Sequence, residues 1–89
     1  MAELFRVTGR VISQKGTCEA GMRVGDEFPV GDLTPPNVCS FAYCAVLPFA
    51  LALQAGGSFP WEQDPDGATI ACPDPNNPVV IELRRVRPA

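Results

Sequence analysis

Residues 41–55 read FAYCAVLPFALALQA and contain no charged side chain. Ser40 before this stretch is a favoured helix N-cap, and the Gly-Gly pair after it provides a C-terminal stop. We therefore expect one helix from Ser40 to about residue 55, with a kink or a broken turn at Pro48, because proline lacks a backbone donor. A helix with no polar face has to be covered on most sides, so this helix is expected to be the centre of the fold.

Alternating side chains predict strands on both sides of this helix. Between residues 4 and 14, apolar Phe5, Val7 and Val11 alternate with polar residues, which is the two-residue period of a half-buried strand. The other expected strands are a short one near 28–30, one at 68–72 and a last one that opens at Pro78. The order β, short β, α, β, β predicts an α+β fold in a single domain of residues 1–89, with a small antiparallel sheet packed on the apolar central helix.

Composition and charge exclude several classes of function. The chain has 89 residues, enough for one domain with one core, and its ten prolines indicate that much of it is ordered loop. Seven Lys and Arg against ten Asp and Glu give a net charge of −3, so no positive field attracts nucleic acid. The sequence contains no histidine, which excludes Ser-His-Asp and Cys-His catalysis and zinc sites with imidazole ligands. Its glycine spacing matches no nucleotide-binding loop, so no nucleotide cofactor is expected.

Two features of the sequence bear on location and partners. The apolar stretch is shorter than the ~20 residues that span a bilayer, so no membrane is expected. Glu3 and Arg6 interrupt the N-terminus where a signal segment would be apolar, so we expect a cytoplasmic protein. Because one sheet can cover only one side of the helix, we expect helix 41–55 to bind a second copy of the chain or a partner protein through its other side.

The four cysteines, Cys18, Cys39, Cys44 and Cys72, are spaced C-x20-C-x4-C-x27-C, without the C-x2-C pair of common zinc and cluster sites. Three of them nevertheless lie at predicted element ends, where loops gather functional groups: Cys18 after the first strand, Cys39 before the helix and Cys72 at the end of the third strand. At Cys39, the positive end of the helix would favour a thiolate. We therefore expect Cys18, Cys39 and Cys72 to bind zinc or an iron–sulfur cluster, with Cys44 as a candidate fourth ligand.

Other interpretations of the cysteines remain open. They can be small buried residues, which is the favoured interpretation for Cys44 inside the apolar helix, and the protein is then an oligomeric accessory module that docks on a larger enzyme. Alternatively, it is a thiol-based redox protein or enzyme with Cys39 as nucleophile and Cys44 or Cys72 as the resolving thiol. Disulfides are the least favoured interpretation, because they are rare in the cytoplasm.

Other polar and aromatic residues are interpreted as structural. Trp61 is expected to pack its loop against the helix, and Tyr43 to be packed rather than catalytic. The acidic loop residues are expected to be solvated, because their spacing does not fit a calcium loop: Glu62, Asp64, Asp66 and Asp74. The basic cluster is expected to be a solvated strand end or a set of salt-bridge partners: Arg84, Arg85 and Arg87.

Three segments of the chain resemble one family. They are residues 15–28 with the pattern G-x-C-x2-G-M-x-V-G-D, residues 47–61 ending in G-G-x-F-P-W, and residues 71–83 with C-P-D-P-x2-P-V-V. Together they are similar to a family of small, uncharacterised prokaryotic proteins of about 90 residues. That family commonly has histidine at the position of Met22, so the resemblance implies a Cys3His metal site that includes Cys18, Cys39 and Cys72. In this sequence, either Cys44 supplies a fourth thiolate, Met22 binds as a thioether, or the fourth position is open or the site is lost.

Overall fold

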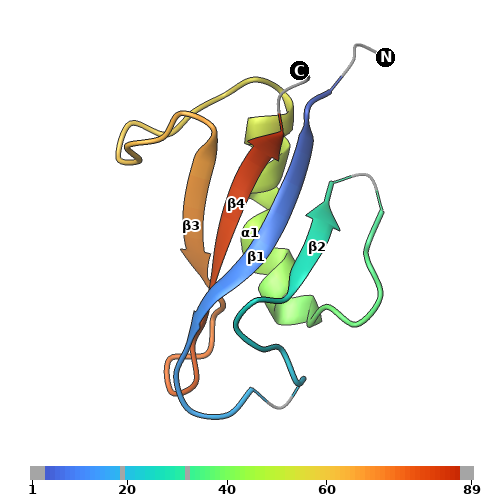
Figure 1. The fold of residues 1–89 in the computed structure, drawn as a ribbon, viewed down its shortest axis with the longest axis vertical. Helices are drawn as coiled ribbons and strands as arrows, with labels where there is room; N and C mark the ends of the chain where they lie inside the picture. Colours follow the sequence, from blue (N-terminus) through green and yellow to red (C-terminus); the bar gives the residue numbers. More distant parts are fainter. Residues whose placement is uncertain (1–3, 19, 32, 87–89) are drawn as a thin grey trace.

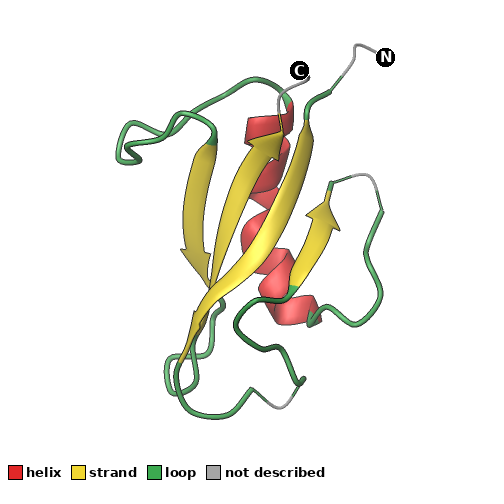
Figure 2. Ribbon diagram, in the orientation of Figure 1, coloured by secondary structure: helices red, strands yellow, loops and turns green. Residues whose placement is uncertain are grey.

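A four-stranded antiparallel sheet and one helix make up the fold (Figure 1). The computed structural model describes residues 4–18, 20–31 and 33–86. Along the chain the elements are β1 (Arg6–Gln14), β2 (Glu27–Val30), α1 (Ser40–Gln54), β3 (Gly67–Ala71) and β4 (Val79–Val86). The strands lie in the order β2-β1-β4-β3, and α1 covers one face of the sheet (Figure 2). The predicted α+β fold and the predicted order of elements are confirmed.

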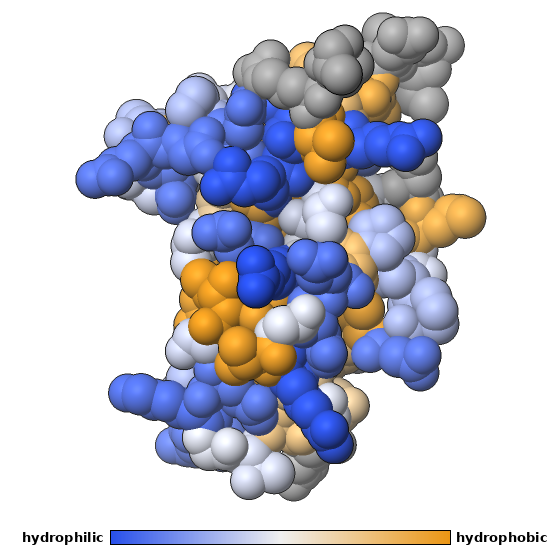
Figure 3. Space-filling model, in the orientation of Figure 1, coloured by the Kyte–Doolittle hydropathy of each residue, from blue (hydrophilic) through white to orange (hydrophobic). Residues whose placement is uncertain are grey.

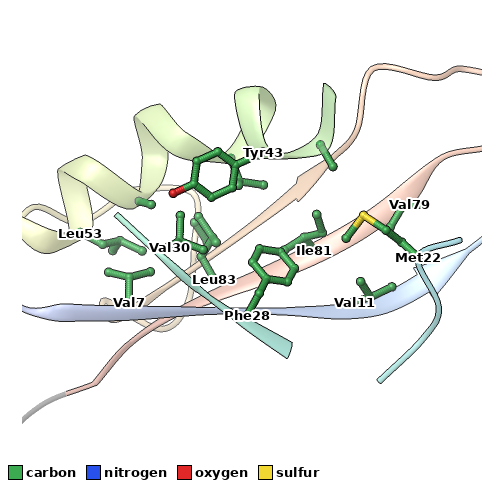
Figure 4. Packing of buried hydrophobic residues seen from close by; sticks show 14 residues of the cluster. Val7, Val11, Met22, Phe28, Val30, Tyr43, Leu53, Val79, Ile81 and Leu83 are labelled. Atoms are coloured by element: carbon green, nitrogen blue, oxygen red, sulfur yellow. The ribbon is translucent and has the colours of Figure 1, made fainter. Parts of the chain in front are cut away.

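The core lies between α1 and the sheet (Figure 4). Strand side chains alternate in direction, so Ile81 and Leu83 both point toward the helix and are fully buried. From α1, Val46, Ala50 and Leu53 are buried in the same core, because positions three and four apart share one face of a helix. The other face of the sheet is mostly hydrophilic, with one group of apolar side chains in it (Figure 3). The sheet therefore covers only one side of α1.

The element boundaries differ slightly from the sequence predictions. The N-cap of α1 is Cys39, with φ −59° and ψ 131°, and Ser40 is the first helical residue. The prediction of Ser40 as N-cap was therefore wrong by one residue, and Cys39 makes no side-chain capping hydrogen bond. β3 ends at Ala71, which leaves Cys72 as the first residue of the following loop.

Pro48 does not interrupt α1. The helix continues from Ser40 to Gln54 with Pro48 inside it, so the predicted broken turn does not form. Proline removes the donor that would bond to the carbonyl oxygen of Cys44. Because Pro48 and Cys44 are both exposed, water can bond to that oxygen instead, and the helix tolerates the missing hydrogen bond.

The loop between α1 and β3 is anchored by Phe59 rather than by Trp61. Trp61 is 67% exposed and stacks on Phe59, with ring centroids 5.1 Å apart. Phe59 packs against the core and lies 5.4 Å from the ring of Phe49 in α1. The prediction that Trp61 packs its loop against the helix was therefore wrong. Phe59 packs against the helix, and Trp61 stacks on the outer side of the Phe59 ring.

Arg85 is buried, although its neighbour Arg84 is exposed. The alternation of β4 that buries Ile81 and Leu83 carries on to Arg85, which is 4% exposed. Its guanidinium forms a salt bridge with Asp66 at 2.8 Å and donates hydrogen bonds to the carbonyl oxygens of Leu53, Gly57 and Pro65. Arg84 forms a salt bridge with Asp64 at 2.7 Å on the solvent side. Of the predicted basic cluster, these two are salt-bridge partners, and Arg87 lies outside the described residues.

Several element ends gather at one end of the molecule. β1 and β3 end near the lower end of Figure 1, where β4 begins, and the N-terminus of α1 lies toward the same end. Residues of the loops that follow β1 and β3 line one pocket together with residues at the start of the helix. Neither α1 nor any other described segment forms a helix that is long and apolar enough to cross a membrane.

Candidate functional site

Three of the four cysteines line one pocket at this end of the molecule. The pocket has a volume of about 600 Å³, and its wall includes Cys18, Cys39 and Cys72. All three are half-buried free thiols. Phe41 and Asp74 also line the pocket. The sequence predicted these three cysteines at element ends, and the antiparallel order of the strands brings those ends together.

Cys39 lies where α1 begins. Its carbonyl oxygen accepts a hydrogen bond from the backbone N–H of Tyr43 at 2.9 Å, which closes the first helical turn. The first turn contains no acidic residue, and Cys39 makes no capping hydrogen bond through its side chain. The partial positive charge of the helix N-terminus is therefore not neutralised by a carboxylate of that turn, and it favours an anion at this wall of the pocket.

Cys72 is held by two hydrogen bonds with Val79, one through its backbone N–H and one through its sulfur. The N–H of Cys72 donates to the carbonyl oxygen of Val79 at 2.8 Å, which extends the pairing of β3 and β4 by one step. The N–H of Val79 donates to Sγ of Cys72 at 3.2 Å. Amide donors to sulfur stabilise thiolates in metal and cluster sites. Cys72 is therefore fixed in position and has a donor suited to a negatively charged sulfur.

Cys18 is placed by the end of β1. The pairing of β1 with β4 shifts between Val11 and Ser13, a bulge that redirects the last residues of the strand. The side-chain amide of Gln14 bonds to two backbone groups. Its oxygen accepts a hydrogen bond from the N–H of Cys18 at 2.8 Å, and its nitrogen donates to the carbonyl oxygen of Met22 at 2.9 Å. The carbonyl oxygen of Cys18 also accepts from the N–H of Gly21 at 2.9 Å. These contacts hold the backbone of Cys18 in a turn beside the strand.

The loop 73–78 is ordered by its own acidic residue. The carboxylate of Asp74 accepts hydrogen bonds from the N–H groups of Asn76 at 3.0 Å and Asn77 at 3.1 Å. These two backbone donors are the main reason that the pKa of Asp74 is below its usual value. The side chain of Asn77 reaches the neighbouring loop, where its Oδ1 accepts from the N–H of Thr17 at 2.9 Å. The loops that carry Cys18 and Cys72 are thus joined directly.

The two candidates for a fourth ligand lie elsewhere. Cys44 is exposed on α1 and is not one of the residues that line the pocket. Met22 is 3% exposed and packs in the core near Val79 and Val11 (Figure 4). Across residues 4–18, 20–31 and 33–86, no three Cys, Asp or Glu side chains are grouped so as to hold a metal ion in this conformation. The pocket therefore offers three thiols on its wall without a preformed metal cage.

Tyr43 and Glu62 both form hydrogen bonds that hold parts of the chain together. The hydroxyl of Tyr43 donates to the carbonyl oxygen of Leu33 at 3.1 Å and accepts from the N–H of Gly31 at 3.2 Å. Tyr43 is therefore packed, as predicted, and ties the loop after β2 to the helix. The carboxylate of Glu62 accepts from the N–H of Thr69 at 3.3 Å, which connects its loop to the exposed edge of β3.

Gln14 and Asn77 were not predicted to take part in the site. A signal for Asn77 was present, because Asp74 followed by two asparagines is typical of a turn in which a carboxylate binds the next backbone N–H groups. That pattern predicts the shape of the loop but not its contact with Thr17, sixty residues away. Gln14 had no signal, because its role depends on a strand bulge that the alternation of side chains does not reveal.

Comparison of the chain with protein-family models, with curated protein sequences and with solved structures found no match. The resemblance to small prokaryotic proteins therefore stays a prediction, and the function has to be inferred from the pocket itself.

Proposed function

We propose that this chain binds a thiophilic metal ion through the thiolates of Cys18, Cys39 and Cys72, with zinc as the favoured ion. The observation that carries the proposal is the common pocket: three cysteines far apart in the sequence line it together. Zinc accepts thiolate ligands at about 2.3 Å and does not require an imidazole. The absence of histidine from the sequence is therefore compatible with such a site.

The electrostatics of the pocket support the proposal. A bound thiolate is an anion, and two features of the wall favour negative charge: the N-terminus of α1 at Cys39 and the Val79 N–H that donates to Cys72 Sγ. Binding would also require movement, because the cysteines do not form a metal cage in this conformation. Cys18 and Cys72 both lie in loops, whose closure over the ion would bring the sulfur atoms within bonding distance.

A single ion fits the pocket better than an iron–sulfur cluster does. Clusters are usually held by four cysteine thiolates, and Cys44 does not line the pocket. Zinc bound by three protein ligands has a fourth position that takes water or an external ligand. Such an open position would let the site act on a bound molecule rather than only stabilise the fold.

The test is metal analysis of protein purified without oxygen, with two matched cysteine variants. We expect about one zinc ion per chain in the wild type and in Cys44→Ala, and loss of the ion in Cys39→Ala. Broad visible absorption with labile sulfide would instead identify a cluster. A folded, metal-free wild type that remains metal-free after zinc is added would contradict the proposal. If Cys39 then reacted rapidly with alkylating agents near neutral pH, the thiol-enzyme alternative would be favoured.

A second proposal concerns the outward face of α1, which we infer to bind another copy of the chain. Four apolar or uncharged side chains are exposed along this face: Phe41, Cys44, Pro48 and Leu51. Phe41 is 71% exposed and Leu51 is 49% exposed. A helix face that leaves such side chains in water is typical of an association surface. An accessory module that docks on a larger enzyme through this face is the alternative, and we place either form in the cytoplasm, where its thiols stay reduced.

A further inference from the structure

One side chain joins the two loops that carry Cys18 and Cys72. Asn77 Oδ1 accepts a hydrogen bond from the N–H of Thr17 at 2.9 Å, and Thr17 immediately precedes Cys18. The N–H of Lys15 donates to the carbonyl oxygen of Pro78 at 3.1 Å, so the two loops also touch through their backbones. Both contacts lie between the end of β1 and the start of β4, next to the pocket.

The close approach of the two loops depends on a glycine. Gly16 has φ +66°, a left-handed backbone conformation that residues with a Cβ rarely adopt. A Cβ at Gly16 would also collide with Oδ1 of Asn77 and lie 3.3 Å from the carbonyl oxygen of Asn76. The backbone conformation at Gly16 and the absence of a side chain there are thus both needed for Asn77 to reach Thr17.

Asp74 fixes the orientation of Asn77. Its carboxylate accepts from the backbone N–H of Asn77 at 3.1 Å, and Nδ2 of Asn77 donates to the second carboxylate oxygen at 3.4 Å. The amide group of Asn77 is therefore oriented, with its nitrogen toward Asp74 and its oxygen toward Thr17. This orientation leaves Oδ1 free to accept from the neighbouring loop.

We propose that Asn77 is a positioning residue for the thiolate pocket, and that its hydrogen bond to Thr17 sets the separation of Cys18 and Cys72. The inference rests on the proposed metal site and adds to it Asn77, a residue that has no sulfur and acts only by holding the two loops together. Two loops that move independently lose conformational entropy when an ion draws their cysteines together. With the loops already joined, less entropy is lost on binding, so the affinity for the ion is higher.

The test compares zinc affinity in the reduced full-length chain by competition with a chromophoric chelator. We expect Asn77→Ala to weaken zinc binding by about 10- to 100-fold, the range typical of residues that orient metal ligands. The matched control is Gln63→Ala, which removes an exposed side-chain amide from a loop that does not line the pocket, and it should change the affinity less than about threefold. Gly16→Ala, which displaces the Asn77 side chain from the other loop, should act in the same direction as Asn77→Ala.

Two further readouts separate positioning from general stability. In the metal-free protein, the Thr17 amide should exchange its hydrogen faster in Asn77→Ala than in the wild type, while the core amides of β4 keep their protection. In cobalt-loaded protein, the sulfur-to-metal absorption per bound ion should fall in Asn77→Ala if Cys18 no longer reaches the ion. A wild type that binds no zinc would overturn both the proposed function and this inference. A wild type that binds zinc with an affinity equal to that of Asn77→Ala would overturn the positioning role alone.

Discussion

Arg85 shows how one residue can connect four parts of this small fold. It lies on β4, and its guanidinium bonds to the end of α1 at Leu53, to Gly57 after the helix, and to Pro65 and Asp66 before β3. It also lies over the ring of Phe5, 5.1 Å from the ring centre. The loop 56–66 has little regular structure of its own, so this arginine is a main reason for its fixed position.

Loss of Arg85 is therefore expected to destabilise the protein strongly. Arg85→Met removes the guanidinium donors from the Asp66 carboxylate and from the carbonyl oxygens of Leu53, Gly57 and Pro65, and we expect the free energy of unfolding to fall by about 3–5 kcal/mol. Arg84→Met removes an exposed salt bridge with Asp64 and should cost less than about 1 kcal/mol. Urea denaturation monitored by circular dichroism measures both. Equal losses in the two variants would show that the buried hydrogen bonds of Arg85 contribute no more than a surface pair.

The sequence contained one signal that Arg85 is buried, the two-residue period of its strand. In the last strand, apolar Val79, Ile81 and Leu83 occupy every second position, and the same two-residue period leads to Arg85. The charge of the side chain led to the opposite expectation, a solvated strand end. A buried arginine is stable only with acceptors, and those come from a loop whose path the sequence does not reveal.

The helix α1 contains one proline, Pro48, which costs the helix a hydrogen bond. Pro48 leaves the carbonyl oxygen of Cys44 without an intrahelical donor. We expect Pro48→Ala to raise the free energy of unfolding by about 1–3 kcal/mol, because it restores that hydrogen bond in an exposed part of the helix. Pro60→Ala, the same change in an exposed loop, should lower stability slightly, because it increases the entropy of the unfolded chain. Thermal unfolding compares the two, and a lower melting temperature for Pro48→Ala would disprove the expected gain.

Asp64 in the loop 56–66 is expected to make the free energy of unfolding depend on pH in the acid range. The backbone N–H of Asp66 and the side chain of Arg84 hold the pKa of Asp64 below its ordinary value of 3.8. As the pH falls below 3.8, Asp64 takes up a proton more readily in the unfolded chain than in the folded one. The stabilisation that Asp64 provides is therefore fully present above pH 3.8 and is lost as the pH falls through the pKa of Asp64 in the folded protein. Denaturation of Asp64→Asn across this range should show a weaker dependence on pH than the wild type. Glu27→Gln, at an exposed position on β2, is the control, and an unchanged slope in Asp64→Asn would rule out this role.

The elements themselves were largely predictable, and their contacts were not. The two-residue period at Val7 and Val11 predicts a strand, whereas the charge-free stretch is recognised as a helix by the Ser40 and Gly-Gly signals at its ends. The pocket was predictable only in part: the sequence placed Cys18, Cys39 and Cys72 near element ends, but not at the same end. That they share a wall follows from the strand order β2-β1-β4-β3, which depends on long-range pairing.

At the scale of the whole molecule, the apolar side of α1 leads to a prediction about assembly. The sheet covers one side of the helix, and Leu51 lies exposed on the other. If a second copy covers this side, Leu51→Glu should convert the oligomer to a monomer, because it places a charge in an apolar contact. Light scattering at micromolar concentrations measures the mass, with Ile12→Glu on the opposite face of the sheet as control. A monomeric wild type would contradict self-association and leave a different protein as the partner of this face.

The pairing of the first strand with the last has a consequence for synthesis on the ribosome. β1 and β4 are the two central strands, and Arg6 pairs with Val86, so the middle of the sheet joins residues from near the two ends of the described chain. Until β4 has left the exit tunnel, β1 has only the four-residue β2 to pair with, and a two-stranded hairpin is marginally stable by itself. Cys72 is held by Val79 in β4, so the thiol pocket forms only after β4 has been synthesised and has paired. An ion bound in this pocket would then have to be delivered after β4 is in place.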